Sequence, residues 1–374
     1  MPGTQKCDVL IAGGGPAGLA AAIALRQRGA DVLVADALRP PIEKPCGEGL
    51  MPETRRELQR LGVEVDSRHG AEFQGILFCQ GEARCAADFP RGRGIGIRRP
   101  ALHQLLLERA AQAGVRLLWG SPVTAHEGDA IRIGGEPCAY RWLVGADGIA
   151  SQVRKWAGLE PDVVRSRRFG FRAHFRVAPW SRHVEIHWGD QGQAYITPVG
   201  PEEVCVAAIT RHSGVRLFDI LGGIPLLSEK LAGAARSTPE RGALTMTRRL
   251  RRVTRGNVAL IGDASGSADA ITGEGLAMSF RQALLLSESL ACGSLEVYEA
   301  RHATTLALPQ RMAAMMLLLD RFGALRSRAL PALAGRPELF RKLLAVHVGE
   351  KPLTEFILRH GPELGLLLLA PQFA

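Results

Sequence analysis

The stretch Cys7 to Asp36, CDVLIAGGGPAGLAAAIALRQRGADVLVAD, decides the fold. A short apolar run, Val9 to Ala12, is long enough for a buried strand, and the Ala/Leu-rich stretch from Ala17 to Arg28 predicts a helix. Gly29 ends that helix, and Val32 to Ala35 forms a second apolar run. The order of strand, helix and strand within about 30 residues predicts a βαβ unit.

The glycines between the first strand and the helix have the spacing of a dinucleotide-binding loop. Gly13, Gly15 and Gly18 form G-x-G-x-x-G, and Asp36 follows the second strand. Gly13 permits the tight turn, Gly15 lets a pyrophosphate approach the backbone, and Gly18 lets helix and strand pack closely. The helix N-terminus favours the diphosphate, and Asp36 is placed to accept a hydrogen bond from a ribose hydroxyl. Because all five features stand in order, a glycine-rich turn without a nucleotide is the weaker interpretation.

The composition is that of a globular protein with a large core. The chain has 374 residues, of which 46% are hydrophobic and 22% charged, so two domains are expected. No apolar run reaches the roughly 18 residues of a membrane span. We expect no signal peptide, since the nucleotide-binding strand begins a few residues after Met1. The seven scattered cysteines form no CxxC pair and favour the cytoplasm.

The net charge of +10 is open to several explanations. Nucleic acid, anionic lipid and acidic ligands all suit a basic protein. The arginines are spread over the whole chain rather than clustered. An anionic dinucleotide therefore explains the charge better than nucleic acid, which is not expected as a partner.

A loop rich in proline and glycine follows the nucleotide-binding unit. Prolines forbid a helix until Pro52, which starts a predicted helix that ends at Leu61. Cys46 is the one reactive side chain in the middle of this loop, next to Gly47. The loop is well placed to reach the reactive end of a cofactor. A small buried apolar residue is an equally good interpretation of Cys46.

Two further motifs place acidic residues at strand ends. In Arg141 to Leu159 a strand ends at Gly145, and Asp147 precedes a helix that begins near Ser151. Open α/β sheets bind ligands at the carboxyl ends of their strands. The competing interpretation is that Asp147 only caps the helix. In Gly256 to Leu290 a strand ends at Gly262 and Asp263, and Gly273, Glu274 and Gly275 open a helix that runs to about Leu290.

The middle of the chain shows a different pattern from the first domain. Apolar and polar residues alternate in four stretches between residues 165 and 250, which predicts a separate antiparallel sheet forming one wall of a substrate pocket. Ala71 to Ala87 predicts two short strands, and Arg98 to Gly114 a helix. From about Ala303 the chain is helical and leucine-rich, with breaks expected at five prolines: Pro309, Pro331, Pro337, Pro352 and Pro362.

Together these motifs resemble the FAD-dependent monooxygenase superfamily with the para-hydroxybenzoate hydroxylase fold. GADGIASQVR, residues 145–154, resembles its DG motif, and Gly262 and Asp263 resemble its GD motif, whose aspartate holds the ribityl chain. Arg99 matches the arginine that contacts the phosphate side of FAD, and Gly273 to Leu276 match the helix start that lies against the flavin pyrimidine. The resemblance implies that FAD is bound by Gly13, Gly15, Pro16, Ala17, Gly18, Asp36, Cys46, Gly47, Arg99, Asp147, Gly262, Asp263, Gly273, Gly275 and Leu276.

The resemblance also implies an architecture. The expected α/β fold has a Rossmann-like FAD-binding domain with a mixed or parallel sheet, an inserted antiparallel substrate domain, and C-terminal helices. The discontinuous FAD-binding domain would take residues 1–70, 95–165 and 255–300. The substrate-binding sheet domain would take residues 71–94 and 166–254, and the helical region residues 301–374.

Within the superfamily, KPCGEGLMP most resembles the cysteine-bearing loop of the geranylgeranyl-reductase-like branch. Those reductases carry a Y-x-W-x-F-P segment, whereas this chain has AYITPVGP, with Tyr195 and Pro198 but no Trp or Phe. The W-x-W-x-I-P motif of halogenases is missing, as is a second G-x-G-x-x-G. We therefore expect non-covalent FAD and an NAD(P)H that binds only transiently.

Three functions are compatible with these motifs. The first is a monooxygenase that hydroxylates or epoxidises an aromatic or polyketide-like molecule through a flavin C4a-hydroperoxide. The alternative is a reductase of an isoprenoid or other lipid alkene, favoured by Cys46 and by the apolar C-terminal helices, which also suggest peripheral membrane contact. A flavoprotein without turnover is the least favoured. The substrate is expected to be a hydrophobic or aromatic small molecule, and Cys46 is the candidate catalytic residue.

Overall fold

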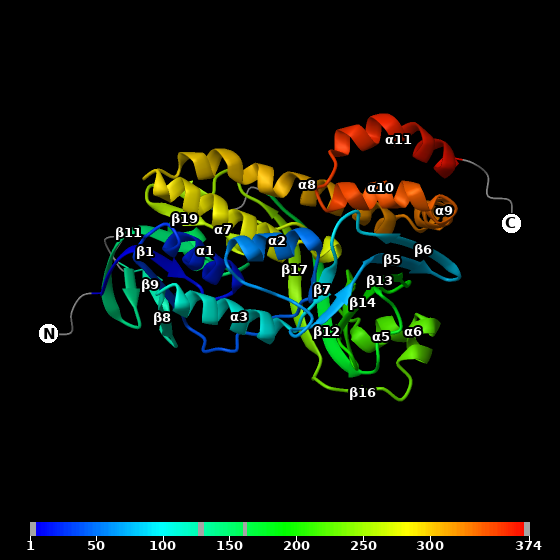
Figure 1. Ribbon diagram of the computed structural model, residues 1–374, viewed down its shortest axis with the longest axis horizontal. Coiled ribbons are helices and arrows are strands. Elements are labelled where there is room, and N and C mark those ends of the chain that lie inside the picture. Colours follow the sequence, from blue (N-terminus) through cyan, green and yellow to red (C-terminus); the bar gives the residue numbers. More distant parts are fainter. Residues whose placement is uncertain (1–4, 126–130, 160–162, 370–374) are drawn as a thin grey trace.

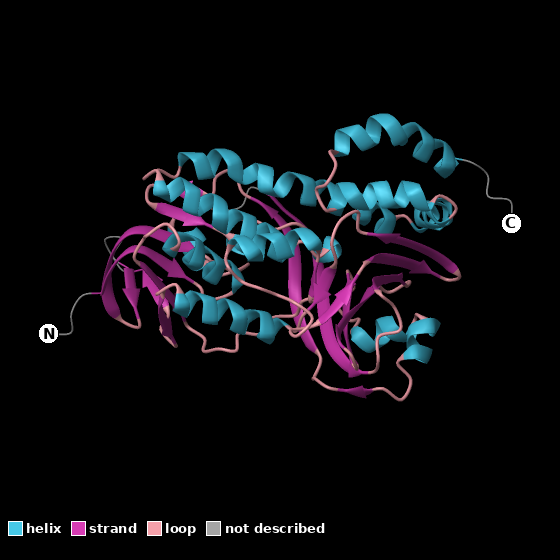
Figure 2. Ribbon diagram, in the orientation of Figure 1, coloured by secondary structure: helices cyan, strands magenta, loops and turns pink. Residues whose placement is uncertain are grey.

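The computed structural model describes residues 5–125, 131–159 and 163–369. Figure 1 shows a parallel sheet near the N-terminus, an antiparallel sheet at the other end of the molecule, and a run of C-terminal helices along one side. Figure 2 shows that helices pack along the parallel sheet, whereas strands of the antiparallel sheet are visible between the C-terminal helices and some short helices. The predicted α/β fold with C-terminal helices is confirmed.

The first sheet is the expected nucleotide-binding sheet. Its strand order is β18-β19-β11-β1-β2-β8, and the five strands from β19 to β8 run parallel. Strands β9 and β10 extend β11 as an antiparallel branch. The bounds are β1 Gln5–Ala12, β2 Val32–Asp36, β8 Arg116–Trp119, β9 Val123–Ala125, β10 Ile131–Ile133, β11 Glu136–Gly145, β18 Thr254–Arg255 and β19 Val258–Leu260.

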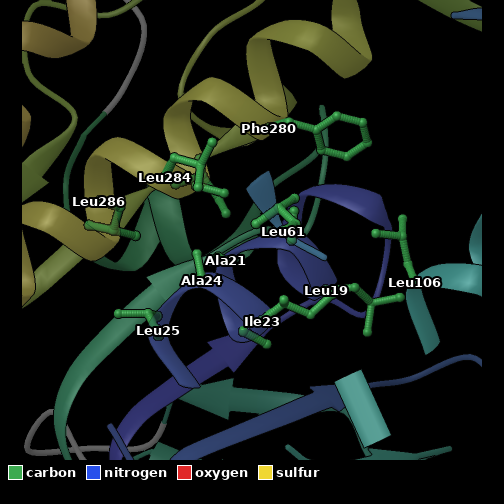
Figure 3. Close-up of a cluster of buried hydrophobic side chains, with 14 of the residues drawn as sticks. Leu19, Ala21, Ile23, Ala24, Leu25, Leu61, Leu106, Phe280, Leu284 and Leu286 are labelled. Atoms are coloured by element: carbon green, nitrogen blue, oxygen red, sulfur yellow. The ribbon is translucent and has the colours of Figure 1, made fainter. Parts of the chain in front are cut away.

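Three helices cover one face of this sheet: α1 Pro16–Arg26, α3 Arg99–Gln112 and α7 Gly275–Ala291. Helix α1 lies at the centre and is buried from Leu19 to Leu25, with alanines that let α7 approach closely. Figure 3 shows Leu19 and Ile23 of α1 near Leu106 of α3, with Phe280 and Leu284 of α7 beside them. The burial of α1 on all sides holds its N-terminus rigidly at the carboxyl end of β1. The short helices α2 Pro52–Arg60 and α4 Gln152–Trp156 complete this part.

The second sheet is formed mainly by residues 163–249 and has the order β16-β12-β15-β14-β13-β5-β6, with β17 also paired to β12. All pairs are antiparallel except β13 with β5. The bounds are β5 Gly75–Gln80, β6 Ala83–Asp88, β12 Val163–Arg176, β13 His183–Trp188, β14 Gln193–Gly200, β15 Glu203–Thr210, β16 Ala235–Arg236 and β17 Arg241–Arg249, with helices α5 Leu217–Gly222 and α6 Pro225–Lys230 on one face.

The prediction of two strands within residues 71–87 is wrong. Three strands lie there, and the first of them, β4 Ala71–Phe73, belongs to a separate small sheet with β3 Gly49–Leu50 and β7 Gly94–Gly96. Gln74 separates β4 from β5, and any side chain at Gly75, the first residue of β5, would meet the backbone of Ala87. The small sheet lies where the chain passes between the two large sheets. Alternation of apolar and polar residues within one short segment does not reveal to which sheet a strand belongs.

The C-terminal helices are α8 Glu296–Arg321, α9 Gly323–Ala334, α10 Pro337–His347 and α11 Leu353–Leu369. The breaks expected at Pro309, Pro331 and Pro362 are wrong, since these prolines lie inside α8, α9 and α11. A proline inside a helix costs about 3 kcal/mol. The buried side chains around Pro309, such as Leu306 and Met312, offset that cost by packing.

The proposed division into domains remains a prediction. Helix α8 passes through its boundary at residue 300 without interruption. Helices α9 and α10 pack on β6, so the C-terminal helices contact the second sheet as well as α7. Within the described residues, no helix is both long and apolar enough to cross a membrane. All seven cysteines are free thiols.

Candidate functional site

The glycine loop between β1 and α1 opens toward empty space at one position only. Gly15 has φ −71° and ψ 177°, and a Cβ built on it would meet no heavy atom within 4 Å. At Gly13, which has φ +111°, a Cβ would lie 2.5 Å from the carbonyl oxygen of Ala146, and at Gly18 it would lie 1.9 Å from that of Gly13. Gly13 and Gly18 are therefore required by the fold, whereas Gly15 leaves room for a bound group.

Residues from three other elements hold this loop in place. The Gly14 amide donates a hydrogen bond to Asp36 Oδ2 over 2.7 Å, and His103 Nε2 of α3 lies 2.8 Å from the Gly14 carbonyl oxygen. The ring of Trp119, at the end of β8, fills the space where a Gly14 side chain would lie. Burial lowers the pKa of His103. Neither Trp119 nor His103 belongs to a recognisable motif, so the sequence alone does not reveal their contacts with this loop.

The DG motif adds a helix cap and an unpartnered oxygen. Asp147 Oδ2 accepts hydrogen bonds from the amides of Gln152 and Val153 over 2.7 and 3.2 Å, so Asp147 does cap α4. Its Oδ1 is buried and, among the described residues, has no hydrogen-bond partner. The same holds for Nε of Arg99 at the start of α3. Capping and ligand binding are thus compatible at Asp147.

The GD motif lies beside the glycine loop. Gly262 adopts φ +59°, and a Cβ there would lie 2.8 Å from Cβ of Ala17, the residue after Pro16 at the start of α1. Asp263 accepts a hydrogen bond from Lys44 Nζ over 2.6 Å. Because Lys44 lies in the loop that carries Cys46, this ion pair joins that loop to the end of β19.

The N-terminus of α7 faces open space. A Cβ at Gly273 or at Gly275 would meet no atom within 4 Å, and no side chain caps the helix. Leu276 in the first turn is half-buried against the core of the first domain. The first turn of a helix has amide groups without intrahelical partners and carries the positive end of the dipole, so this end of α7 favours an anionic or carbonyl group.

The loop around Cys46 is anchored by Glu48, which the sequence analysis did not single out. Glu48 is buried and adopts φ +59°, a backbone conformation that residues other than glycine rarely take. Its Oε1 accepts a hydrogen bond from the Arg99 amide over 2.9 Å, and its Oε2 lies 2.6 Å from His174 Nε2 on β12. The carbonyl oxygen of Cys46 accepts a bond from the Cys205 thiol over 3.7 Å. Glu48 therefore ties the loop both to α3 and to the second sheet.

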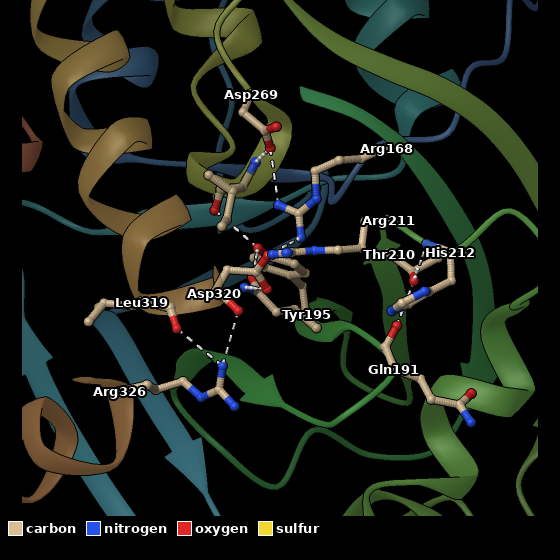
Figure 4. A network of polar contacts seen from close by, with 12 residues as sticks. Arg168, Gln191, Tyr195, Thr210, Arg211, His212, Asp269, Leu319, Asp320 and Arg326 are labelled. Carbon is tan, nitrogen blue, oxygen red and sulfur yellow. Dashed lines mark hydrogen bonds and ion pairs between the residues drawn. The ribbon is translucent and has the colours of Figure 1, made fainter. Parts of the chain in front are cut away.

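A buried polar network links α8, the second sheet and the segment that leads into α7 (Figure 4). Arg168 of β12 contacts Asp269 over 3.3 Å and Asp320 of α8 over 3.2 Å. Asp269 caps the short helix η3 Ala270–Thr272, and the hydroxyl of Tyr195 lies 3.1 Å from the carbonyl oxygen of Ile271 in that helix. The network positions η3, and through it Gly273 and the start of α7.

The expected site residues gather at one edge of the first sheet. They lie at the carboxyl ends of β1, β2, β11 and β19, at the starts of α1, α3 and α7, and on the Cys46 loop. A Cβ at Gly47 in that loop also meets no atom within 4 Å. Open glycines, uncapped helix N-termini and unpartnered buried polar atoms are what a dinucleotide with a flavin ring requires. The residues present fit FAD.

Comparison with known proteins agrees with this geometry. A family model described as "FAD binding domain" matches residues 6–209, more than half of the chain. The menaquinone reductase of Mycolicibacterium smegmatis is 28% identical over 88% of this chain and 91% of its own. The putative FAD-dependent monooxygenase YetM of Bacillus subtilis is 26% identical over 75% of this chain and 84% of its own.

Solved structures show the same fold at lower identity. A flavoprotein/dehydrogenase from Cytophaga hutchinsonii is 16% identical, with a TM-score of 0.81 over 97% of this chain and 98% of its own. The similarity therefore extends through the second sheet and the C-terminal helices. By its family match, its fold and the chemistry of this site, the chain belongs to the FAD binding domain family and is an FAD-dependent oxidoreductase.

Proposed function

We propose that FAD lies across the edge of the first sheet, with its diphosphate at Gly15 and its pyrimidine ring at the start of α7. Asp36 would hold the adenosine ribose, Arg99 the phosphate side, and Asp263 the ribityl chain. Three open glycines, Gly15, Gly47 and Gly275, support this placement. The bound flavin would supply the redox chemistry, while the chain supplies position and fixed dipoles.

Asp263→Ala is expected to weaken FAD binding tenfold or more. A carboxylate that accepts bonds from ribityl hydroxyls contributes about 1.5–3 kcal/mol for each charge-assisted bond. Flavin content of the purified variant and a fluorescence titration of its FAD-free form would measure the loss. Lys44→Ala is the matched control, because it removes only the partner of Asp263 in a half-exposed ion pair of about 1 kcal/mol or less. Full flavin occupancy in Asp263→Ala would contradict the assignment.

We infer that the reaction is reduction of a hydrophobic alkene or quinone of the isoprenoid type. The observation that carries this inference is the Cys46 loop, which Glu48 locks between α3 and the second sheet. A rigid loop holds a thiol in a constant position relative to the ring. The menaquinone reductase relative aligns over nearly the whole chain, which supports a substrate of this class. The order of the two hypotheses drawn from the sequence is thereby reversed.

In this reaction the chain would provide the proton for the carbon that does not receive the hydride. Reduction of an alkene adds a hydride to one carbon and needs a proton for the other. Cys46 carries a thiol proton, and both its backbone and its side chain are held: Cys205 donates to its carbonyl oxygen, and the Glu48 amide donates to its Sγ over 3.4 Å. Tyr195, which aligns with the aromatic segment of lipid reductases, is instead bound to η3. NAD(P)H would bind transiently as the reductant.

The second candidate is hydroxylation of an aromatic molecule with O2. It is supported by the similarity to the putative monooxygenase YetM over three quarters of the chain. In that reaction the thiol of Cys46 has no proton to deliver, because the oxygen transfer brings its own. The two candidates therefore differ in how strongly turnover depends on Cys46 and on O2.

Cys46→Ala is expected to lower anaerobic turnover about 100-fold or more, the scale of a missing general acid. FAD should remain bound and reducible by NADPH, since the thiol is not needed for either. Turnover would be followed as reduced product formed from menaquinone and from shorter prenyl quinones. Cys292→Ala, at an exposed thiol, is the matched control.

Retention of activity within about tenfold in Cys46→Ala, together with turnover that requires O2, would favour hydroxylation instead. A pure packing change at a half-buried thiol accounts for no more than about 1.4 kcal/mol, which corresponds to that tenfold limit. Cys46→Ser would separate proton donation from shape, because a hydroxyl keeps a proton at nearly the same place.

A lipid-like substrate also needs a route to the protein, and we propose peripheral membrane contact through α11. This helix exposes Ile357, Leu358 and Leu366, with 54%, 80% and 71% of their surfaces accessible. Arg359 in the same helix is paired with Glu355, so it is the net charge of the whole chain, +10, that favours anionic lipid. Co-sedimentation with anionic vesicles, compared with Leu358→Glu, would measure this contact.

A further inference from the structure

A cleft lies between α2, α7, α8 and the turn that follows α10. It has a volume of about 410 Å³. Its lining includes Glu53 of α2, Arg281 of α7, Thr305 and Leu308 of α8, and Val348 after α10. Nothing in the proposed reaction uses this cleft.

Two buried carboxyl groups lie between this cleft and the N-terminus of α7. Glu53 is 4% exposed, and neither of its carboxyl oxygens has a hydrogen-bond partner among the described residues. Glu274, the residue at the N-cap of α7, is 3% exposed, and its Oε2 likewise has no such partner. Buried polar atoms are rarely left unpaired unless they have a task. Burial raises the pKa of each carboxyl to about 7.

His347, at the end of α10, lies close to Glu274 and interacts electrostatically with Glu53. Its Nδ1 lies 3.8 Å from Glu274 Oε2, a separation that a bridging water or a small side-chain rotation closes. Burial lowers the pKa of His347 and outweighs the charge of Glu53, which raises that pKa, so the imidazole is neutral at pH 7. A neutral imidazole accepts a proton at one nitrogen and releases one from the other.

The other charged groups around the acids are paired. Arg281 lies 3.5 Å from Glu57, and Arg56 lies 2.8 Å from Glu350, which is also 3.6 Å from Arg91. Arg281 lowers the pKa of both Glu53 and Glu274, while Glu274 raises that of Glu53. The two acids are therefore the groups in this region that change charge near neutral pH.

We propose that Glu53, His347 and Glu274 form a proton path from the cleft to the N-terminus of α7, and that Glu274 takes up one proton when the flavin is reduced. This inference rests on the cofactor placement proposed above. Negative charge that arrives at the start of α7 repels an ionised Glu274 and favours its neutral form. The proton comes from water in the cleft: Glu53 protonates His347, His347 protonates Glu274, and Glu53 is reprotonated from the cleft.

The flavin midpoint potential, measured against pH, tests the uptake. Each proton taken up with two electrons changes the equilibrium tenfold per pH unit, or about 30 mV. Between pH 7 and 8 the wild-type potential should fall with a slope up to about 30 mV per pH unit steeper than that of Glu274→Gln. Glu53→Gln should keep the wild-type slope but slow proton uptake at least tenfold. The uptake would be followed with a pH-indicator dye after photoreduction of the bound flavin.

Thr304→Val is the matched control, because Thr304 lines the same cleft but carries no titratable group. It should match the wild type in both measurements. A shifted potential with an unchanged slope in Glu274→Gln would keep the flavin placement and overturn the proton path. An unchanged potential at every pH would overturn both. Wild-type uptake rates in Glu53→Gln would remove Glu53 from the path.

The stability of the FAD-free protein gives an independent measurement. Glu53 has a pKa near 7 in the folded chain and near 4.5 when unfolded, so the unfolded state ionises first as the pH rises. Wild-type stability is therefore lost between about pH 4.5 and pH 7. Glu53→Gln does not ionise, and its melting temperature relative to wild type should rise over this range and level off above it. A constant difference would show that Glu53 is not a buried acid in solution.

Discussion

Gly15→Val is expected to abolish FAD binding, with at least a 100-fold loss of affinity, while the chain stays folded. A valine side chain would occupy the space at the N-terminus of α1 where we propose that the diphosphate binds. The backbone tolerates the change, because Gly15 has φ −71° and ψ 177°, which any residue adopts and which suits a residue before proline. A fluorescence titration of FAD would measure affinity, and circular dichroism would confirm folding.

Two other glycines provide contrasting controls. Gly214→Val makes the same change at an exposed loop position where a Cβ also meets no atom, so FAD affinity should be that of the wild type. Gly18→Ala would place a Cβ 1.9 Å from the Gly13 carbonyl oxygen, so the folded yield should fall. Wild-type affinity in Gly15→Val would show that this loop does not hold the cofactor.

Arg168→Met is expected to destabilise the protein by about 3 kcal/mol or more. Arg168 is 3% exposed in its side chain and is paired with Asp269, which is fully buried. Removing one partner of a buried ion pair costs about 3–5 kcal/mol, because the remaining charge loses that part of its compensation. Urea unfolding at constant FAD concentration would measure the loss. Flavin occupancy should also fall, because Asp269 caps the η3 helix that leads into α7.

A double variant distinguishes charge from packing. Arg168→Met combined with Asp269→Asn removes both charges of the pair, so it should be more stable than Arg168→Met alone. Arg211→Ala is a milder control, since Arg211 is 44% exposed and its pairing with Asp320 is partly solvated. Equal stability of the single and double variants would show that the buried charge of Asp269 is not the cause.

The elements that the sequence predicted best are those with strong local signals. The βαβ unit from Cys7 to Asp36, the helix started by Pro52 and the strand that ends at Gly262 all appear in the structure close to the expected bounds. Each combines an apolar run with a residue that constrains the backbone. The predicted helix breaks at Pro309 and Pro331 are wrong, because the local rule that proline ends a helix was applied where packing of the surrounding side chains decides the outcome.

In the candidate site, too, some residues were predicted from local motifs, whereas their contacts became visible only in the structure. Motif residues such as Gly15, Asp147 and Asp263 were identified from spacing alone, since a phosphate-binding turn or a strand-end carboxylate is encoded within a few residues. Their binding roles remain predictions. The structure added that Asp147 caps α4 while one of its oxygens stays unpartnered, which makes the helix-capping interpretation correct without excluding the other.

The sequence by itself determined the dinucleotide-binding unit and the order of the main elements, because turns, caps and apolar periodicity depend on neighbouring residues. FAD itself was implied by the resemblance of the motifs to a known family. Only the tertiary structure showed that Glu48 meets His174, 126 positions away, or that Glu53, Glu274 and His347 share one buried region. Such groups carry no motif, since their chemistry arises from loss of water and from partners that the folded chain brings together. Local sequence does not encode the burial of a polar group, and the roles that we propose for Glu48, Glu53, Glu274 and His347 depend on that burial.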